Sequence, residues 1–153
     1  MYIYSTFMIS NNLFRIAYAN RILYQLQFLT TPPTDFGPQT PFSKQVYTEL
    51  CAYFQGQRQQ FSFSYEAQGT PFQKKVWQAL THIPYGETRS YKDIAIAIGQ
   101  PAAARAIGCA NHHNPLPIVI PCHRVICANG QLGGYVGGQP FKAVLLRMEA
   151  KHQ

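Results

Sequence analysis

The most reactive side chains of this 153-residue chain lie around Cys122, which Pro121 precedes and His123 and Arg124 follow. A nucleophilic cysteine needs a base or a positive field to form thiolate near neutral pH. With two potential cations beside it, Cys122 is expected to hold a larger thiolate fraction than an ordinary cysteine. The alternative is that Cys122 is only a small buried residue and His123 a hydrogen-bonded core histidine.

Zinc binding is a second interpretation of the same region. Three cysteines and three histidines lie within nineteen positions of one another, namely Cys109, His112, His113, Cys122, His123 and Cys127. Zinc prefers such ligands, but the sequence has no Cys-x-x-Cys pair, and prolines stiffen the backbone around Cys122. We therefore expect neither a metal site nor a cofactor.

Prolines and glycines indicate how Cys122 is positioned. Pro115, Pro117 and Pro121 exclude a helix across the apolar residues 118–120, so an extended buried segment is expected to deliver Cys122. A glycine-rich loop over 130–138 follows. Apolar residues at helical spacing then predict a last helix, with Phe141, Val144, Leu145 and Met148 on one side.

Two short helices are predicted near the middle of the chain. Ser90 and Asp93 form a capping box that opens the first helix, which stops at Gly99. Pro101 is expected to open the second, so that three residues separate the helices, as in a helix-turn-helix. Helical hairpins that merely pack together follow the same pattern. The second helix is rich in alanine, and Arg105 is the one long cation in it.

The first part of the chain has the pattern of a small α/β unit. Alternating apolar residues predict a β-hairpin over 13–28 with a turn at Ala19 and Asn20. Apolar residues at helical spacing then run to Gly56, and a further strand is expected over 61–65.

The expected fold class is α/β (α+β), with two parts that meet near Gly69. Thr70, Pro71 and Gln73 form the start of a capped helix, which marks a change of pattern. We therefore expect an N-terminal α/β subdomain over residues 1–69 and a mostly helical C-terminal domain over 70–153, which holds the helix-turn-helix and the cysteine.

Basic residues are concentrated in the second part of the chain. Residues 70–153 hold nine Lys or Arg against three acidic residues, whereas 1–69 hold four against three. The net charges of +6 and +1 favour a polyanionic partner, although basic residues can also serve only for solubility.

Composition also bears on compartment. With 46% apolar residues the chain does not need disulfides, so its four cysteines are expected to be free thiols. No stretch approaches the roughly 20 apolar residues that span a bilayer, and the first ten residues lack the pattern of a signal peptide. We expect a cytoplasmic, monomeric protein without membrane contact.

The run from Ile118 to Val125 resembles the active-site signature of O6-alkylguanine-DNA alkyltransferases, also called methylated-DNA–protein-cysteine methyltransferases. The resemblance covers about residues 70–149, and the first 69 residues match only loosely. Its other motifs are a helix start at Gly86-Glu87 and Ser90-Tyr91, a recognition helix at Ala103-Ala104-Arg105-Ala106, a hinge at Asn114-Pro115, and a substrate loop at Gly133-Gly134-Tyr135 with Gly137-Gly138.

The resemblance implies DNA repair by irreversible, stoichiometric transfer of an alkyl group from O6-alkylguanine to Cys122, with O4-alkylthymine as a further candidate substrate. His123 would act as a base through water, and Glu149 would orient its imidazole. Asn114 would hold the hinge through hydrogen bonds to backbone, and Tyr91 would donate toward the purine ring.

The same resemblance assigns the contacts with the base. Tyr135 would border it, and the carbonyls of Cys122 and Val125 would accept from the guanine amine. The Val136 amide would approach O6.

Double-stranded DNA is the partner that the resemblance implies, bound in the minor groove without sequence preference. The alkylated nucleotide must leave the duplex to react, and Arg105 would fill the gap. The small side chains of Ala103, Ala104 and Ala106 would allow close approach, and Lys92 and Gln100 would add contacts.

Three other functions fit parts of the sequence. A reader of alkylated bases that does no repair would have another residue in place of Cys122. A cysteine hydrolase could use Cys122, His123 and Glu149, but would not explain the hinge or the alanine-rich helix. A transcription regulator would need a further domain, for which 153 residues leave no room.

Overall fold

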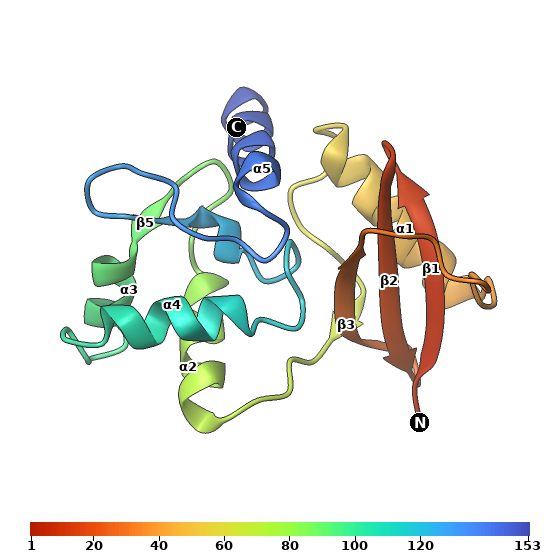
Figure 1. The fold of residues 1–153 in the computed structure, drawn as a ribbon, viewed down its shortest axis with the longest axis horizontal. Coiled ribbons are helices and arrows are strands. Elements are labelled where there is room, and N and C mark those ends of the chain that lie inside the picture. Colours follow the sequence, from red (N-terminus) through yellow and green to blue (C-terminus); the bar gives the residue numbers. More distant parts are fainter. The chain divides into compact units, whose positions relative to one another are not determined.

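The computed structural model describes all 153 residues, and they divide into two units, Met1–Gln68 and Gly69–Gln153 (Figure 1). The mixed α/β class agrees with the expectation from sequence. No helix has the length and apolar character that a membrane span requires.

The first unit is built on a four-stranded sheet in the order β1-β2-β3-β4. Its elements are β1 (Ile3–Ile9), β2 (Asn12–Ala19), β3 (Ile22–Leu29), α1 (Pro41–Phe54) and β4 (Ser64–Tyr65). β1, β2 and β3 are antiparallel, and β4 joins β3 in parallel. Helix α1 lies along the sheet (Figure 1), and aromatic pairs such as Phe14–Phe54 and Tyr18–Phe42 form the contact.

Two differences from the expected pattern concern this unit. The strand β1 was not predicted, and it extends the hairpin through a second two-residue turn, in which Ser10 and Asn11 have φ of 50° and 66°. Such positive φ angles are those of the turns that match the twist of a hairpin. The strand expected over 61–65 is shorter, because only Ser64 and Tyr65 pair with β3.

The second unit is mostly helical. Its elements are α2 (Pro71–Leu80), β5 (Arg89–Ser90), α3 (Tyr91–Ala97), α4 (Ala104–His112), the 3₁₀ turn η1 (Cys122–Arg124), β6 (Val125–Ile126) and α5 (Gln139–Lys151). The short strands β5 and β6 pair in parallel, so the start of α3 lies next to the segment that follows Cys122. The core is formed by apolar side chains of every helix, including Val76, Leu80, Ile94, Ile107 and Leu145.

The helix expected from Pro101 begins later, at Ala104. The Ala103 amide donates to the Gln100 carbonyl over 2.9 Å and closes a turn with Pro101 at its second position. Proline is favoured at that position of a β-turn as well as at the first position of a helix. Six residues therefore separate α3 and α4 instead of three.

Candidate active site and nucleic-acid interface

Cys122 is the first residue of η1 and is 4% exposed. The preceding segment is not extended throughout, as the sequence suggested, because Ile118 has φ of 74° and the Ile120 amide donates to the Leu116 carbonyl. The Cys122 amide then donates to the Ile120 carbonyl over 2.8 Å. The prolines exclude a helix here, but they allow a chain of tight turns.

Asn114 holds this chain of turns in place. Its side-chain Nδ2 donates to the Ile120 carbonyl over 2.9 Å, and its Oδ1 accepts from the Leu116 amide over 2.9 Å. The side chain also interacts with the Cys122 thiol. One buried amide therefore connects the end of the α4 segment to the backbone that positions the sulfur.

His123, the residue after Cys122, forms a buried pair with Glu149. His123 Nε2 lies 2.7 Å from Glu149 Oε2, and both side chains are almost completely buried. Burial lowers the pKa of His123, and Glu149 opposes that shift without reversing it. The imidazole is therefore neutral at neutral pH and able to accept a proton.

Glu149 is also bound by Arg124, a partner that the sequence did not predict. Arg124 Nε donates to Oε1 over 2.8 Å, its second terminal nitrogen donates to Oε2 over 3.0 Å, and its first donates to the Ile83 carbonyl over 2.8 Å. Burial alone would raise the pKa of Glu149, but the hydrogen bonds from His123 and Arg124 outweigh it and lower the pKa. The carboxylate is thus ionised and fixed.

The expectation of a thiolate-rich Cys122 is wrong for the protein without DNA. Burial raises the pKa of Cys122 to about 11, although Asn114 and Lys142 act in the opposite direction. The pKa of Cys122 shifts in the direction opposite to the expectation, because the Arg124 charge is paired with Glu149 and His123 is neutral. The resting nucleophile is a thiol.

Lys142 is a second buried cation that sequence reasoning missed. Its Nζ donates to the carbonyls of Val125, Leu132 and Gly134 over 2.6, 2.5 and 3.2 Å. It therefore joins helix α5 to β6 and to the glycine-rich loop. Helical spacing in the sequence could have indicated its burial, because Lys142 lies three and seven residues before Leu145 and Glu149, which share the buried side of α5.

A cavity of about 220 Å³ brings together several of the predicted site residues. It is lined by Tyr91, Gly108, Asn111, His112, Cys122, Gly134, Tyr135 and Val136. Burial raises the pKa of Tyr91, so its phenol keeps the proton it would donate. Val125 does not line the cavity, and Asn111, which does, was not singled out in the sequence.

The predicted DNA-binding residues lie on α3, α4 and the turn between them. The side chains of Lys92, Gln100, Arg105 and Ala106 are exposed, and those of Ala103 and Ala104 are half-buried. No side chain caps the start of α4, so its first amides are available to an anion.

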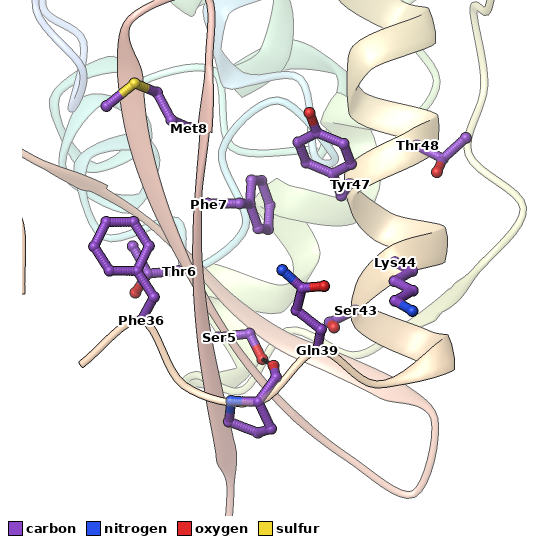
Figure 2. A pocket seen from close by; sticks show the side chains of 11 residues that line it. Ser5, Thr6, Phe7, Met8, Phe36, Gln39, Ser43, Lys44, Tyr47 and Thr48 are labelled. Carbon is purple, nitrogen blue, oxygen red and sulfur yellow. Dashed lines mark hydrogen bonds between the residues drawn. The ribbon is translucent and has the colours of Figure 1, made fainter.

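Other candidate sites contain less chemistry. The cysteines and histidines of the zinc interpretation do not gather into a group of three, and all four cysteines are free. A larger cavity of about 520 Å³ lies in the first unit between β1 and α1 (Figure 2). It holds hydroxyl and aromatic side chains with Lys44, but no cysteine, histidine or carboxylate.

Comparisons with known proteins identify the family of this chain. Residues 71–151 match the family model described as "6-O-methylguanine DNA methyltransferase, DNA binding domain". The chain is 48% identical over 136 residues to the methylated-DNA–protein-cysteine methyltransferase of Mycobacterium leprae. The alignment covers 86% of this chain and 82% of that protein.

Solved structures extend the likeness to the whole chain. The crystal structure of Mycobacterium tuberculosis O6-methylguanine methyltransferase has a TM-score of 0.89 at 41% identity, and covers 100% of this chain and 95% of that one. Mycobacterium tuberculosis OGT in complex with DNA has the same TM-score at 43% identity, and covers 97% and 93%. Fold and site therefore define a DNA-binding methyltransferase with a protein cysteine as acceptor. The chain belongs to the methylated-DNA–protein-cysteine methyltransferase family.

Proposed function

We propose that this protein repairs DNA by a single, irreversible transfer of the alkyl group of O6-alkylguanine to the sulfur of Cys122. The activity, alkyl transfer from DNA to a protein cysteine, is that of the family. The observation that carries the assignment to Cys122 is its place in a base-sized cavity, one residue before the His123 that pairs with Glu149.

The transfer is a displacement at the alkyl carbon. The Cys122 thiol gives its proton through a water to His123, at Nδ1, the ring nitrogen away from Glu149. The sulfur–carbon bond forms as the bond from carbon to O6 breaks, and guanine leaves with the electron pair. A hydrogen bond from the Tyr91 phenol stabilises the developing charge, and the proton that His123 accepted passes to the leaving guanine, so that both end neutral.

Glu149 makes His123 a better base as the reaction proceeds. The imidazolium that forms lies 2.7 Å from an ionised carboxylate, which stabilises it in a buried environment. The Lys142 ammonium favours the thiolate, as its effect on the pKa of Cys122 indicates. No further group in the cavity removes an alkyl group from sulfur, so each molecule acts once.

DNA is bound through α3 and α4, with α4 in the minor groove and no preference for sequence. The exposed Arg105 fills the gap left by the flipped nucleotide, and the half-buried Ala103 and Ala104 allow close approach. The carbonyls of Cys122 and Val125 accept from the guanine amine, and the Val125 carbonyl also accepts from Lys142 Nζ.

The protein acts as a monomer in the cytoplasm. The same chemistry applies to O4-alkylthymine.

The test is mass spectrometry of the protein after incubation with a duplex that carries one O6-methylguanine. We expect one added methyl on the Cys122 peptide, a yield capped at one per protein, and no transfer to the Cys122→Ala variant, which still binds DNA. Binding without modification of Cys122 would make the protein a lesion reader. Repeated turnover of an ester or amide would make it a hydrolase.

A further inference from the structure

Asn111 has a buried side chain without a hydrogen-bond partner in the protein. Neither Nδ2 nor Oδ1 of its amide is bonded, although the residue is only 7% exposed. Buried amides are nearly always satisfied, so an unpaired one needs a reason. Asn114, three residues along the chain, uses both ends of its amide for backbone contacts.

Asn111 is one of the residues that line the cavity shared with Cys122. It lies near the end of α4, and Tyr91, Tyr135 and Val136 are on the other elements that line the cavity. The Asn111 amide thus has two hydrogen-bonding groups that no protein atom satisfies, in a residue at the wall of the cavity that Cys122 shares.

The proposed function leaves ring acceptors of the alkylated guanine without a donor, and N7 is one of them. The amine is matched by carbonyls, O6 by the Val136 amide, and the ring by the Tyr91 phenol. N7 lies next to O6 on the imidazole edge of the base and is an acceptor.

We propose that Asn111 is a substrate-binding residue whose Nδ2 donates a hydrogen bond to N7 of the flipped alkylguanine. This inference rests on the proposed function and adds a purine-specific contact to it. As the alkyl–oxygen bond breaks, negative charge spreads from O6 over the purine. A donor at N7 therefore binds the leaving base more strongly in the transition state than in the ground state.

The experiment is a cycle of two proteins and two substrates. Single-turnover rates of methyl transfer are measured for the unmodified protein and Asn111→Leu, each with duplexes that carry O6-methylguanine or O6-methyl-7-deazaguanine. Leucine keeps the volume and removes the donor. The 7-deaza substitution should lower the rate of both proteins by some factor. We expect this factor to be about ten times larger for the unmodified protein than for Asn111→Leu, which is the loss typical of one hydrogen bond.

A duplex with O6-methyl-3-deazaguanine is the matched control, because the removed nitrogen lies on the other edge of the base. Its loss in rate is expected to be equal in the two proteins. Circular dichroism and thermal unfolding of Asn111→Leu check the fold.

The outcomes separate the inference from the proposed function. If the unmodified protein methylates Cys122 but both proteins lose the same factor with the 7-deaza substrate, Asn111 does not bind N7. If the unmodified protein transfers no methyl group from O6-methylguanine, the proposed function itself fails. A coupling seen equally with the 3-deaza substrate would overturn the assignment to N7.

Discussion

The Cys122 thiol is almost fully buried, and its pKa is raised to about 11 although three basic residues lie near it in sequence or in space. A nearby cation has little effect on the thiol when an opposite charge compensates it. The Arg124 guanidinium is bound to Glu149, and the charge that lowers the pKa of the thiol is the Lys142 ammonium, which acts together with the hydrogen bond from Asn114. In the resting protein the Cys122 sulfur is therefore protonated, and a protonated thiol reacts slowly.

Alkylation by iodoacetamide should show this directly. In the absence of DNA we expect Cys122 to react more slowly at pH 8 than the exposed Cys109, with a rate that rises toward an inflection near pH 11. Peptide mass spectrometry over a range of pH measures both sites in one sample. A Cys122 rate that levels off below pH 9 would show that the thiol is activated before DNA binds.

The buried His123–Glu149–Arg124 cluster should make stability depend on acid. Both His123 and Glu149 have a lowered pKa in the folded state, so the unfolded chain takes up more protons as the pH falls below about 6.5 and then about 4.5. The free energy of unfolding should therefore decrease on acidification. Urea unfolding between pH 7 and pH 4 measures it.

Glu149→Gln is the matched variant for this cluster. It leaves the Arg124 charge buried without its partner and should cost about 3–5 kcal/mol at pH 7. It should also flatten the pH dependence below pH 4.5, since the carboxylate that titrates there is gone. An unchanged slope would mean that other carboxylates carry the acid sensitivity.

At the scale of elements, the glycine-rich loop depends on the space beside Tyr91. Gly133 has φ of +74°, and a Cβ there would lie 2.9 Å from the Tyr91 hydroxyl oxygen. We expect Gly133→Ala to displace the loop or the phenol and to slow methyl transfer at least tenfold while the chain remains folded. Single-turnover assays with Gly130→Ala give the control, because Gly130 has a similar φ of +88° and a Cβ at that position meets nothing within 4 Å. Equal rates for the two variants would contradict this role.

The α4 helix presents Arg105 as an exposed cation, and its proposed task is specific to duplex DNA. Arg105→Ala should slow repair of an O6-methylguanine duplex about tenfold or more, because unstacking a base costs a few kcal/mol. The reaction with free O6-benzylguanine should change little. Arg147→Ala removes an equal charge from the exposed side of α5 and serves as the control. Equal losses on both substrates would refute the flipping role.

Local patterns predicted the elements well where one interaction decides them. The capping boxes at Thr70 and Ser90 start α2 and α3 as expected. Pro101 fits either a turn or a helix start, and only the Gln100–Ala103 hydrogen bond distinguishes them. The site residues that sequence reasoning missed, Lys142 and Asn111, owe their roles to burial and to partners distant in the chain, which spacing does not reveal.

On the scale of the whole molecule, charge and chemistry are both concentrated in the second unit. Residues 70–153 carry a net charge of +6, and the first unit holds none of the predicted site residues. Attraction to DNA therefore comes mainly from the unit that reacts with it.

DNA affinity should accordingly fall steeply with salt. A plot of the logarithm of the binding constant against that of salt concentration should be linear, with a slope of about −0.9 per phosphate contact. Lys92→Ala should reduce the slope by about 1, whatever the sequence of the duplex. Lys44→Ala, in the first unit, should leave it unchanged. Fluorescence anisotropy between 50 and 200 mM salt tests this, and an equal effect of the two variants would place the first unit on the DNA.

A repair protein that works once is a consumable, so its value depends on how long it survives unused. The buried, protonated thiol of Cys122 protects the unused molecule from inactivation, because oxidants and other electrophiles react with accessible thiolates. The slow resting state thus preserves each copy for the lesion that will consume it.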